Sequence, residues 1–303
     1  MKVGSPFPEG AGLLVVGGDA MIGYAMIREA DRRGVPCWWT TRRPPRDNRA
    51  LPLDLVEPPV AFAPPRGARV VVLVAAQARL QACEDDPALA ARINVDAVRV
   101  LAHRFAALGL RVLLLSTSQV HQASRIRRGE TAPPSPVNEY GRQKVRAEGI
   151  VTALPGGAVL RLTKVLEPDN ALLSSWLAEM GGGRPIHPFH DMMMAPVSLA
   201  AAVDVILALA AQASAQGIYQ FSASHDISYA DAARYLARRG GWDEQRVMPR
   251  SFRDAGLTPV LAPAVTAMDV CRLSDALGIG APAPEAALDA FLVARRNAIS
   301  FPS

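Results

Sequence analysis

The sequence predicts an α/β protein with a doubly wound parallel sheet and a smaller C-terminal lobe. Short apolar runs alternate with helical patterns as far as residue 165, which is typical of successive right-handed βαβ units. The strand-like runs are continuously apolar, as expected of parallel strands buried on both faces. Beyond residue 165 the alternation loosens. We therefore expect a sheet-containing domain over residues 11–165 and a mainly separate lobe over residues 166–303, interwoven with the first.

Punctuating residues set the bounds of the expected elements. Gly34 ends the first helix, and Pro87 and Gly109 flank the second. Trp38 and Trp39 are neighbours on one strand, so their rings should lie on opposite sheet faces. Residues 1–11 read as a loose arm rich in Gly and Pro. Strands are expected over residues 13–16, 35–40, 51–55, 69–76, 111–116, 158–165 and 218–221. Helices are expected over residues 22–33, 86–108, 140–153, 169–180, 198–212, 228–239 and 284–296.

Length and composition exclude several classes of protein. The chain has 303 residues, half of them hydrophobic and a fifth charged, which excludes a disordered or low-complexity chain. No apolar run reaches the ~18 residues that a membrane span needs, and the N-terminus has no apolar signal-peptide core. The three cysteines, Cys37, Cys83 and Cys271, are scattered and lack metal-site spacing. We expect a reduced, cytoplasmic protein without a metal site.

The charge pattern favours a small anionic ligand over nucleic acid. Lys and Arg number 33 against 28 Asp and Glu, and the basic residues are spread along the chain rather than gathered in a stripe. Lysine occurs only at Lys2, Lys144 and Lys164. The two internal lysines therefore call for an explanation, because lysine is the compact cation that can sit beside a catalytic group.

A glycine-rich turn follows the first predicted strand. Residues 17–23 form a G-x-x-A-x-x-G pattern between that strand and a helix. Gly17 permits the tight turn, Gly23 lets the helix pack close to the strand, and small Ala20 lets a pyrophosphate approach the helix N-terminus. The alternative is a plain strand-to-helix turn that merely needs glycine. We predict a Rossmann-like dinucleotide site whose turn residues bind the cofactor: Gly17, Asp19, Ala20, Met21, Ile22 and Gly23.

Residues at the ends of the second, third and fourth predicted strands indicate which dinucleotide binds. Arg42 and Arg43 stand where NAD-binding proteins usually carry an acidic residue, and arginine accommodates the 2′-phosphate of NADP. An exposed basic loop is the alternative, so NAD(H) stays open as the second cofactor. Asp54 and the adjacent Leu55 are expected to contact the adenine of the cofactor. The alternative is that Asp54 simply caps a turn. Small Ala75 and Ala76 close the fourth strand and leave room for the cofactor.

A tyrosine and a lysine share one face of the helix that begins near residue 140. Tyr140 and Lys144 are spaced i, i+4, and a nearby ammonium is expected to lower the pKa of the phenol. Hydroxyl groups at Ser116, Thr117 and Ser118 end the fifth predicted strand. Because the carboxyl ends of parallel strands open into one crevice, we expect these groups to meet there. The combination indicates proton transfer beside a dinucleotide.

These motifs carry a family resemblance. The chain resembles the extended short-chain dehydrogenases/reductases and, among them, the dTDP-4-dehydrorhamnose reductase group, over nearly its whole length. The resemblance continues in Asn94-Val95, Ala147-Glu148, Leu160-Arg161-Leu162, Gly217-Ile218-Tyr219 and Leu277-Gly278-Ile279. It implies that Tyr140 protonates a sugar ketone oxygen, that Thr117 hydrogen-bonds that oxygen, and that Lys144 binds the nicotinamide ribose and tunes Tyr140.

The chain departs from that group at three places. The threonine motif continues as residues 118–122, Ser-Gln-Val-His-Gln, rather than Asp-Tyr-Val-Phe-Asp, and Lys164 replaces a tryptophan. The C-terminal Arg-Pro is Ala262-Pro263. We predict Ser118, His121 and Lys164 as substrate contacts. His121 could instead be an exposed loop residue, and Lys164 a partner in a surface salt bridge.

We therefore expect an NADPH-dependent reductase of a nucleotide-linked keto sugar of the 4-keto-6-deoxy type. Two alternatives stay open: a nucleotide-sugar epimerase with bound NAD, and a non-catalytic NADP-binding regulatory subunit. The expected partner is a small-molecule nucleotide sugar, with no nucleic acid and no membrane, and a homodimer stays open. His187, His190 and Asp191 form a loop in the lobe rather than a metal site, because they lack ligand spacing.

Overall fold

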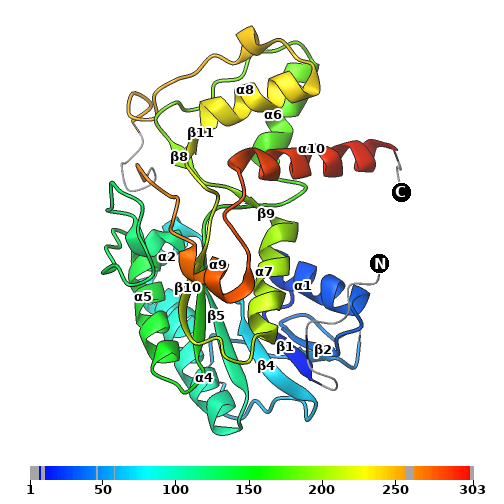
Figure 1. The fold of residues 1–303 in the computed structure, drawn as a ribbon, viewed down its shortest axis with the longest axis vertical. Coiled ribbons are helices and arrows are strands. Elements are labelled where there is room, and N and C mark those ends of the chain that lie inside the picture. Colours follow the sequence, from blue (N-terminus) through cyan, green and yellow to red (C-terminus); the bar gives the residue numbers. More distant parts are fainter. Residues whose placement is uncertain (1–6, 8–10, 46, 58, 257–262, 301–303) are drawn as a thin grey trace.

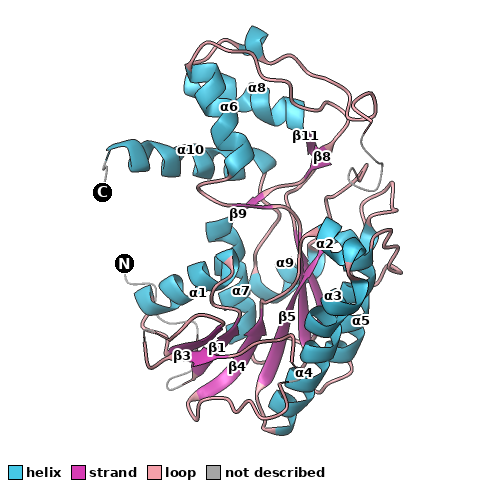
Figure 2. Cartoon of the chain, turned by 180° about the vertical axis from the view of Figure 1, so that it is seen from behind, coloured by secondary structure: helices cyan, strands magenta, loops and turns pink. Residues whose placement is uncertain are grey.

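The computed structural model describes residues 7, 11–45, 47–57, 59–256 and 263–300, the last four by their backbone alone. The predicted arm over residues 1–11 falls almost wholly outside this range. Two layers of helices enclose one large sheet, and a smaller lobe stands beyond the carboxyl ends of its strands (Figures 1 and 2).

The large sheet has seven strands in the order β10-β6-β5-β4-β1-β2-β3, and every neighbouring pair is parallel. The chain first moves outward from β1 through β2 to β3 and then crosses to β4 on the other side of β1. This reversal confirms the doubly wound fold, and it opens a crevice at the carboxyl ends of β1 and β4. The strands are β1 Gly12–Val16, β2 Cys37–Thr41, β3 Ala50–Pro52, β4 Ala68–Leu73, β5 Arg111–Thr117, β6 Ala158–Leu162 and β10 Gly217–Phe221.

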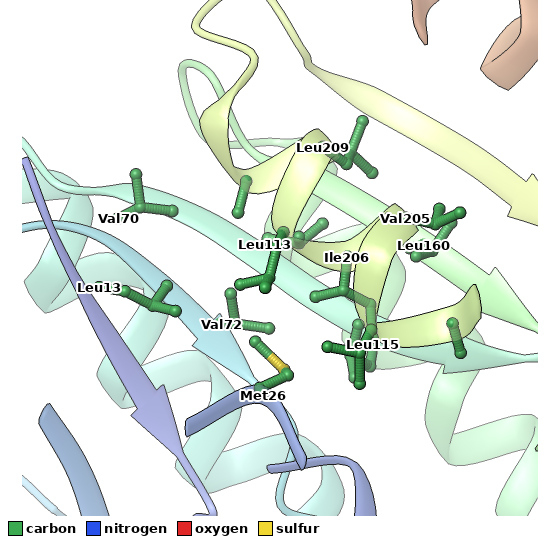
Figure 3. Packing of buried hydrophobic residues seen from close by; sticks show 14 of the residues in the cluster. Leu13, Met26, Val70, Val72, Leu113, Leu115, Leu160, Val205, Ile206 and Leu209 are labelled. Atoms are coloured by element: carbon green, nitrogen blue, oxygen red, sulfur yellow. The ribbon is translucent and has the colours of Figure 1, made fainter. Parts of the chain in front are cut away.

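Alternate side chains of these strands enter two separate cores. Helices α1 (Met21–Arg32) and α7 (Leu199–Ala211) cover one face, and α4 (Ala97–Ala107) and α5 (Glu139–Thr152) cover the other (Figure 2). Figure 3 shows the first core, where Met26 of α1 and Ile206 of α7 pack over the strands. Each fully buried aliphatic side chain stabilises the fold by about 1.5–3 kcal/mol, which explains why the strand segments are continuously apolar. The strand residues of this core include Leu13, Val70, Val72, Leu113, Leu115 and Leu160.

The two tryptophans behave as predicted. Trp38 packs against the core under α4 and α5, and Trp39 packs against the opposite core.

The single long helix expected over residues 86–108 is wrong. The chain forms α2 (Leu80–Asp85), α3 (Pro87–Ala91), one π-helical turn and then α4. The π turn contains Asn94, whose buried amide bonds both backbone groups of Gln77, at 2.9 and 3.0 Å, and donates to Gln143 Oε1 at 2.8 Å. An extra residue in the helical turn therefore brings Asn94 to the loop after β4.

The C-terminal lobe contains two pairs of short strands. β7 (Val165–Leu166) pairs in parallel with β9 (Val197–Ser198), and β8 (Met193–Met194) pairs antiparallel with β11 (Ile227–Ser228). The strand expected over residues 158–165 thus divides, because β6 ends at Leu162 and Val165 joins another sheet. The lobe's helices and 3-10 turn are α6 Ala171–Gly181, α8 Tyr229–Gly240, η3 Glu244–Arg246 and α10 Pro284–Ser300.

The two units are interleaved. Residues 199–221 belong to the second predicted unit, yet they supply α7 and β10 to the large sheet, and α9 (Cys271–Leu277) packs beside β10. None of the helices in the described part of the chain combines the length and apolarity that a bilayer crossing demands.

Candidate functional site

The turn after β1 requires glycine at two positions. Gly17 has φ +106°, and a Cβ there would lie 2.7 Å from the Ala75 backbone nitrogen. A Cβ on Gly23 would lie 2.1 Å from the Gly17 carbonyl oxygen. Both positions therefore exclude larger residues, and the start of α1 is drawn against the turn. Gly23 lies behind the turn and serves this packing, so it does not itself line a described pocket.

A pocket of about 430 Å³ lies beside the glycine turn. The predicted cofactor residues that line it are Gly17, Asp19, Ala20, Arg42, Asp54, Leu55, Ala75 and Ala76. Arg43 is not among its described lining residues; its side chain is exposed, and its Nε lies 4.0 Å from Asp19 Oδ1. Arg79, which the sequence did not single out, also lines the pocket. The pocket thus carries two arginines from separate elements.

A second pocket of about 310 Å³ continues from the first, since both share Ala20 and Ala76. Met21 and Ile22 line it as predicted, and it brings together Thr117, Tyr140 and Lys144. The structure therefore gathers the predicted catalytic set from the end of β5 and the first turns of α5.

The N-terminus of α5 is fastened to the segment after β5. Asn138 caps the helix by accepting from the Gly141 backbone N–H at 2.7 Å, and its amide donates to Gln119 Oε1 at 2.9 Å. Gln119 lies in the 3-10 turn η2 (Ser118–His121), directly after Thr117. A Cβ on Gly141 would lie 2.8 Å from the Gln119 carbonyl oxygen. This close approach sets the spacing of Tyr140 from Thr117.

Burial, rather than the neighbouring cation, determines the direction in which the pKa of Tyr140 shifts. Lys144 is 2% exposed, its Nζ donates to the Leu115 carbonyl at 2.9 Å, and it lies 5.9 Å from the centre of the Tyr140 ring. Burial lowers the pKa of Lys144 to about 8, against the opposing effects of Glu148 and Cys83. Burial raises the pKa of Tyr140, and Cys83 adds to this. The expectation of a lowered phenol pKa is therefore wrong, and the phenol remains a proton donor at neutral pH.

A third pocket, of about 240 Å³, lies between the sheet and the lobe. It shares Thr117 and Thr163 with the pocket of Tyr140, so the two are contiguous. Ser118 and Lys164 line it as predicted. Lys164 is exposed and has no ion pair with any described carboxylate, which removes the salt-bridge alternative within that part of the chain. The lobe contributes Met192, Met193, Met194, Tyr229, Pro263 and Thr266, whereas Ala262 lies outside the described residues.

The structure corrects the expectation for His121. Its side chain is 4% exposed, is not among the described lining residues of the third pocket, and lies with Nε2 at 2.9 Å from an Arg161 guanidinium nitrogen. Burial lowers the pKa of His121 to about 4, helped by Arg161 and Arg128, so the ring is neutral. His121 therefore fixes the η2 turn to the buried Arg161 and does not line the third pocket.

Arg161 belongs to a buried ion pair that the sequence analysis did not identify as such. It binds both carboxylate oxygens of Glu148, at 3.0 and 2.7 Å, and Ser116 Oγ donates to Glu148 at 2.5 Å. Through Ser116, the pair contacts the end of β5 one residue before Thr117. An arginine inside an otherwise apolar strand was the available signal, because such a residue needs a buried acidic partner.

The His187–Asp191 loop has a structural explanation. Asp191 accepts from Ser251 Oγ and from the Phe252 backbone N–H, both at 2.7 Å, and His187 Nδ1 lies 3.2 Å from the Met248 carbonyl. No group of three or more potential metal ligands occurs among the residues that the structure describes.

Comparison with known proteins decides the family. Residues 11–296 match the family model described as the RmlD substrate binding domain. The chain belongs to this family. A dTDP-4-dehydrorhamnose reductase of Sinorhizobium fredii is 27% identical over 176 residues, which cover 55% of this chain and 60% of that relative. One from Mycobacterium tuberculosis is 28% identical over 254 residues, 79% of each chain. Methionine adenosyltransferase 2 subunit beta of Bos taurus is 25% identical over 290 residues, 90% of this chain and 84% of that one.

Solved structures of other proteins share the fold of this chain. A dTDP-4-dehydrorhamnose reductase from Clostridium acetobutylicum superposes with a TM-score of 0.81 at 19% identity, over 94% of this chain and 99% of that one. The Bacillus anthracis reductase, solved in complex with NADP, gives 0.78 at 18% identity, over 93% and 98%. MoeE5, solved with UDP-glucuronic acid and NAD, gives 0.75 at 19% identity, over 95% and 99%.

Proposed function

We propose that the protein is an NADPH-dependent reductase of a keto sugar nucleotide, of the 4-keto-6-deoxy type. The observation that carries the proposal is the meeting of Thr117, Tyr140 and Lys144 in the middle one of three contiguous pockets. One neighbouring pocket suits a dinucleotide and the other opens to the lobe. The family and the reductases among its relatives support the same activity.

The residues of the turn and the first two pockets fit NADP(H). The glycine turn forms a cradle that a Cβ would fill, and Arg42 supplies a cation where a 2′-phosphate would lie. Residues 17–22, Ala75 and Ala76 would hold the dinucleotide, and Lys144 would bind its nicotinamide ribose. When bound, the reduced nicotinamide supplies the hydride.

Tyr140 completes the reduction by giving the phenol proton to the ketone oxygen as that oxygen gains negative charge. The raised pKa of Tyr140 suits this direction, because the phenol must be protonated before the step. Thr117 Oγ1 accepts from the Gln119 backbone N–H at 3.2 Å, which leaves its hydroxyl proton free to hydrogen-bond the same ketone oxygen. Lys144 steadies the phenolate with its charge until solvent returns the proton.

The experiment is an assay of NADPH oxidation with a panel of nucleotide-linked 4-keto sugars, including dTDP-4-dehydrorhamnose. We expect turnover with at least one member of the panel and release of NADP. Failure of every keto sugar in the presence of bound NADPH would contradict a reductase.

Two other functions remain as candidates. The similarity to a subunit of methionine adenosyltransferase 2 favours a regulatory subunit, which would bind NADP(H) and turn over no sugar. A solved UDP-glucose 4-epimerase shares the fold, and an epimerase would retain NAD through purification. Bound NAD in the purified protein would identify the epimerase, and the keto sugar panel distinguishes the reductase from a regulatory subunit that binds NADP(H) without turnover.

We further propose a cytoplasmic location, because Cys37, Cys83 and Cys271 are free thiols, which suits a reducing compartment. The proposed assembly is a homodimer that binds a small-molecule substrate and no nucleic acid. Light scattering tests the dimer.

A further inference from the structure

Asp19 is a fixed negative charge in the wall of the dinucleotide pocket. Its two carboxylate oxygens accept from the Thr41 hydroxyl at 3.0 and 2.9 Å, and one of them accepts from the Arg42 backbone N–H at 3.1 Å. The side chain keeps 33% of its surface exposed and lines the pocket. The carboxylate is thus held against the end of β2 while one side stays open to a ligand.

This charge stands beside the arginines that are expected to select NADP. Arg43 Nε lies 4.0 Å from Asp19 Oδ1, and the Thr41 hydroxyl that binds Asp19 also accepts from the Arg43 backbone N–H at 3.0 Å. A phosphate held by Arg42 or Arg43 would therefore lie next to Asp19. It would meet a like charge and would compete with that carboxylate for Arg43.

We propose that Asp19 limits the preference for NADPH over NADH. The arginines attract the 2′-phosphate, and Asp19 opposes it. The hydroxyls of an unphosphorylated ribose, by contrast, can donate hydrogen bonds to the open side of the carboxylate. The pocket therefore accommodates both dinucleotides, with a smaller discrimination than its arginines alone would give. This inference rests on the proposed dinucleotide site and adds the residue that sets its selectivity.

The test compares dissociation constants of NADPH and NADH for the full-length wild type and for Asp19→Asn, measured by calorimetry. Asparagine keeps a carbonyl oxygen for Thr41 and Arg42 but loses the charge. We expect the NADPH preference to rise by roughly three- to tenfold, and the rise to shrink at high salt. Arg42→Ala should move the preference in the opposite direction.

Asp54→Asn is the matched control. Asp54 lines the same pocket and accepts from the Val56 backbone N–H at 3.0 Å, but it makes no ion pair with a described arginine. This substitution should alter both affinities alike and leave their ratio unchanged. A purely structural role of Asp19 would give the same result for Asp19→Asn.

An unchanged ratio in Asp19→Asn, or a shift toward NADH, overturns the inference while the dinucleotide site stands. If wild-type protein binds neither dinucleotide, the proposed function falls first and the inference falls with it. Should Asp19→Asn fail to fold, Asp19→Ser is compared for adenosine 2′,5′-bisphosphate and adenosine 5′-phosphate. A relative gain for the bisphosphate is then expected, and no gain overturns the role of Asp19.

Discussion

The sheet domain and the C-terminal lobe contribute differently to the site. The sheet domain supplies the glycine turn, Thr117, Tyr140 and Lys144 from elements buried in two continuous cores. The lobe supplies one wall of the third pocket from short strands and loops, including three adjacent methionines. Methionine is flexible and adapts to irregular shapes. We therefore propose that the sheet domain sets the chemistry and that the lobe side of the crevice sets which sugar is accepted.

Substitutions in the two regions should therefore change different kinetic constants. Substitutions at the end of β5 and the start of α5 should lower kcat, and substitutions on the lobe side of the third pocket should raise KM while NADPH affinity stays constant. Mixed effects from either region would weaken the division.

The largest effect is expected from Tyr140→Phe. This change removes the proton donor without removing the ring, and general acid catalysis contributes about 10²–10⁴-fold. We expect kcat to fall by that factor while the dissociation constant of NADPH changes less than about twofold, by steady-state kinetics and calorimetry. Wild-type turnover in this variant would remove Tyr140 from the mechanism.

Breaking the buried ion pair between Glu148 and Arg161 should strongly destabilise the sheet domain. Glu148→Ala leaves Arg161 buried and unpaired, which costs about 3–5 kcal/mol of unfolding free energy. Arg142→Ala is the matched control on the same helix, because this side chain is 48% exposed and its ion pair with Glu139 contributes about 0–1 kcal/mol. Chemical denaturation measures both, and equal losses would contradict the account of this ion pair.

The lowered pKa of Lys144 predicts a pH dependence. The buried ammonium loses its proton as pH rises through about 8, so its charge is present below that pH and absent above it. NADPH affinity should therefore fall by roughly 10-fold or more on the alkaline side, as expected for a lost charged hydrogen bond. Calorimetric titration across this range measures the fall, and Lys144→Met should bind weakly at every pH. A flat profile for the wild type would exclude Lys144 from the ribose contact.

The smallest expected effect lies on the lobe side of the crevice. Lys164→Ala should raise the substrate KM several-fold, by the loss of one exposed charged contact, and leave NADPH affinity unchanged. Lys164→Trp should fold and bind NADPH normally. We also expect dTDP-4-dehydrorhamnose to be a poor substrate of the wild type. An unchanged KM in Lys164→Ala, or efficient reduction of that sugar, would show that Lys164 does not select the substrate.

The sequence predicts the sheet domain well, because its signals are local. Continuous apolar runs specify buried parallel strands, and the glycine turn needs only seven consecutive residues. The end of β5 and the start of α5 then fall on one crevice by topology alone. The assignment of Thr117, Tyr140 and Lys144 to one pocket followed from this.

Long-range contacts explain what the sequence did not predict. The π turn depends on the bond between Asn94 and Gln77, and the burial of His121 depends on Arg161, 40 residues away. The raised pKa of Tyr140 likewise reflects burial that no i, i+4 spacing reveals. The walls of the third pocket come from the end of β5, the η2 turn, the two residues after β6 and several lobe segments, so their shape depends on how the lobe meets the sheet.

The proposed mechanism transfers a hydride from the nicotinamide to a sugar ketone in this crevice, with Tyr140 as the proton donor. NADPH carrying deuterium at C4 of the nicotinamide tests it most directly, with the product of the best keto sugar nucleotide analysed by mass spectrometry and NMR. We expect one deuterium on the carbon of the former ketone, one NADP formed per sugar reduced, and formation of the same labelled product about 10²–10⁴-fold more slowly by Tyr140→Phe. Sugar interconversion without net consumption of NADPH, or a product without deuterium, would contradict it.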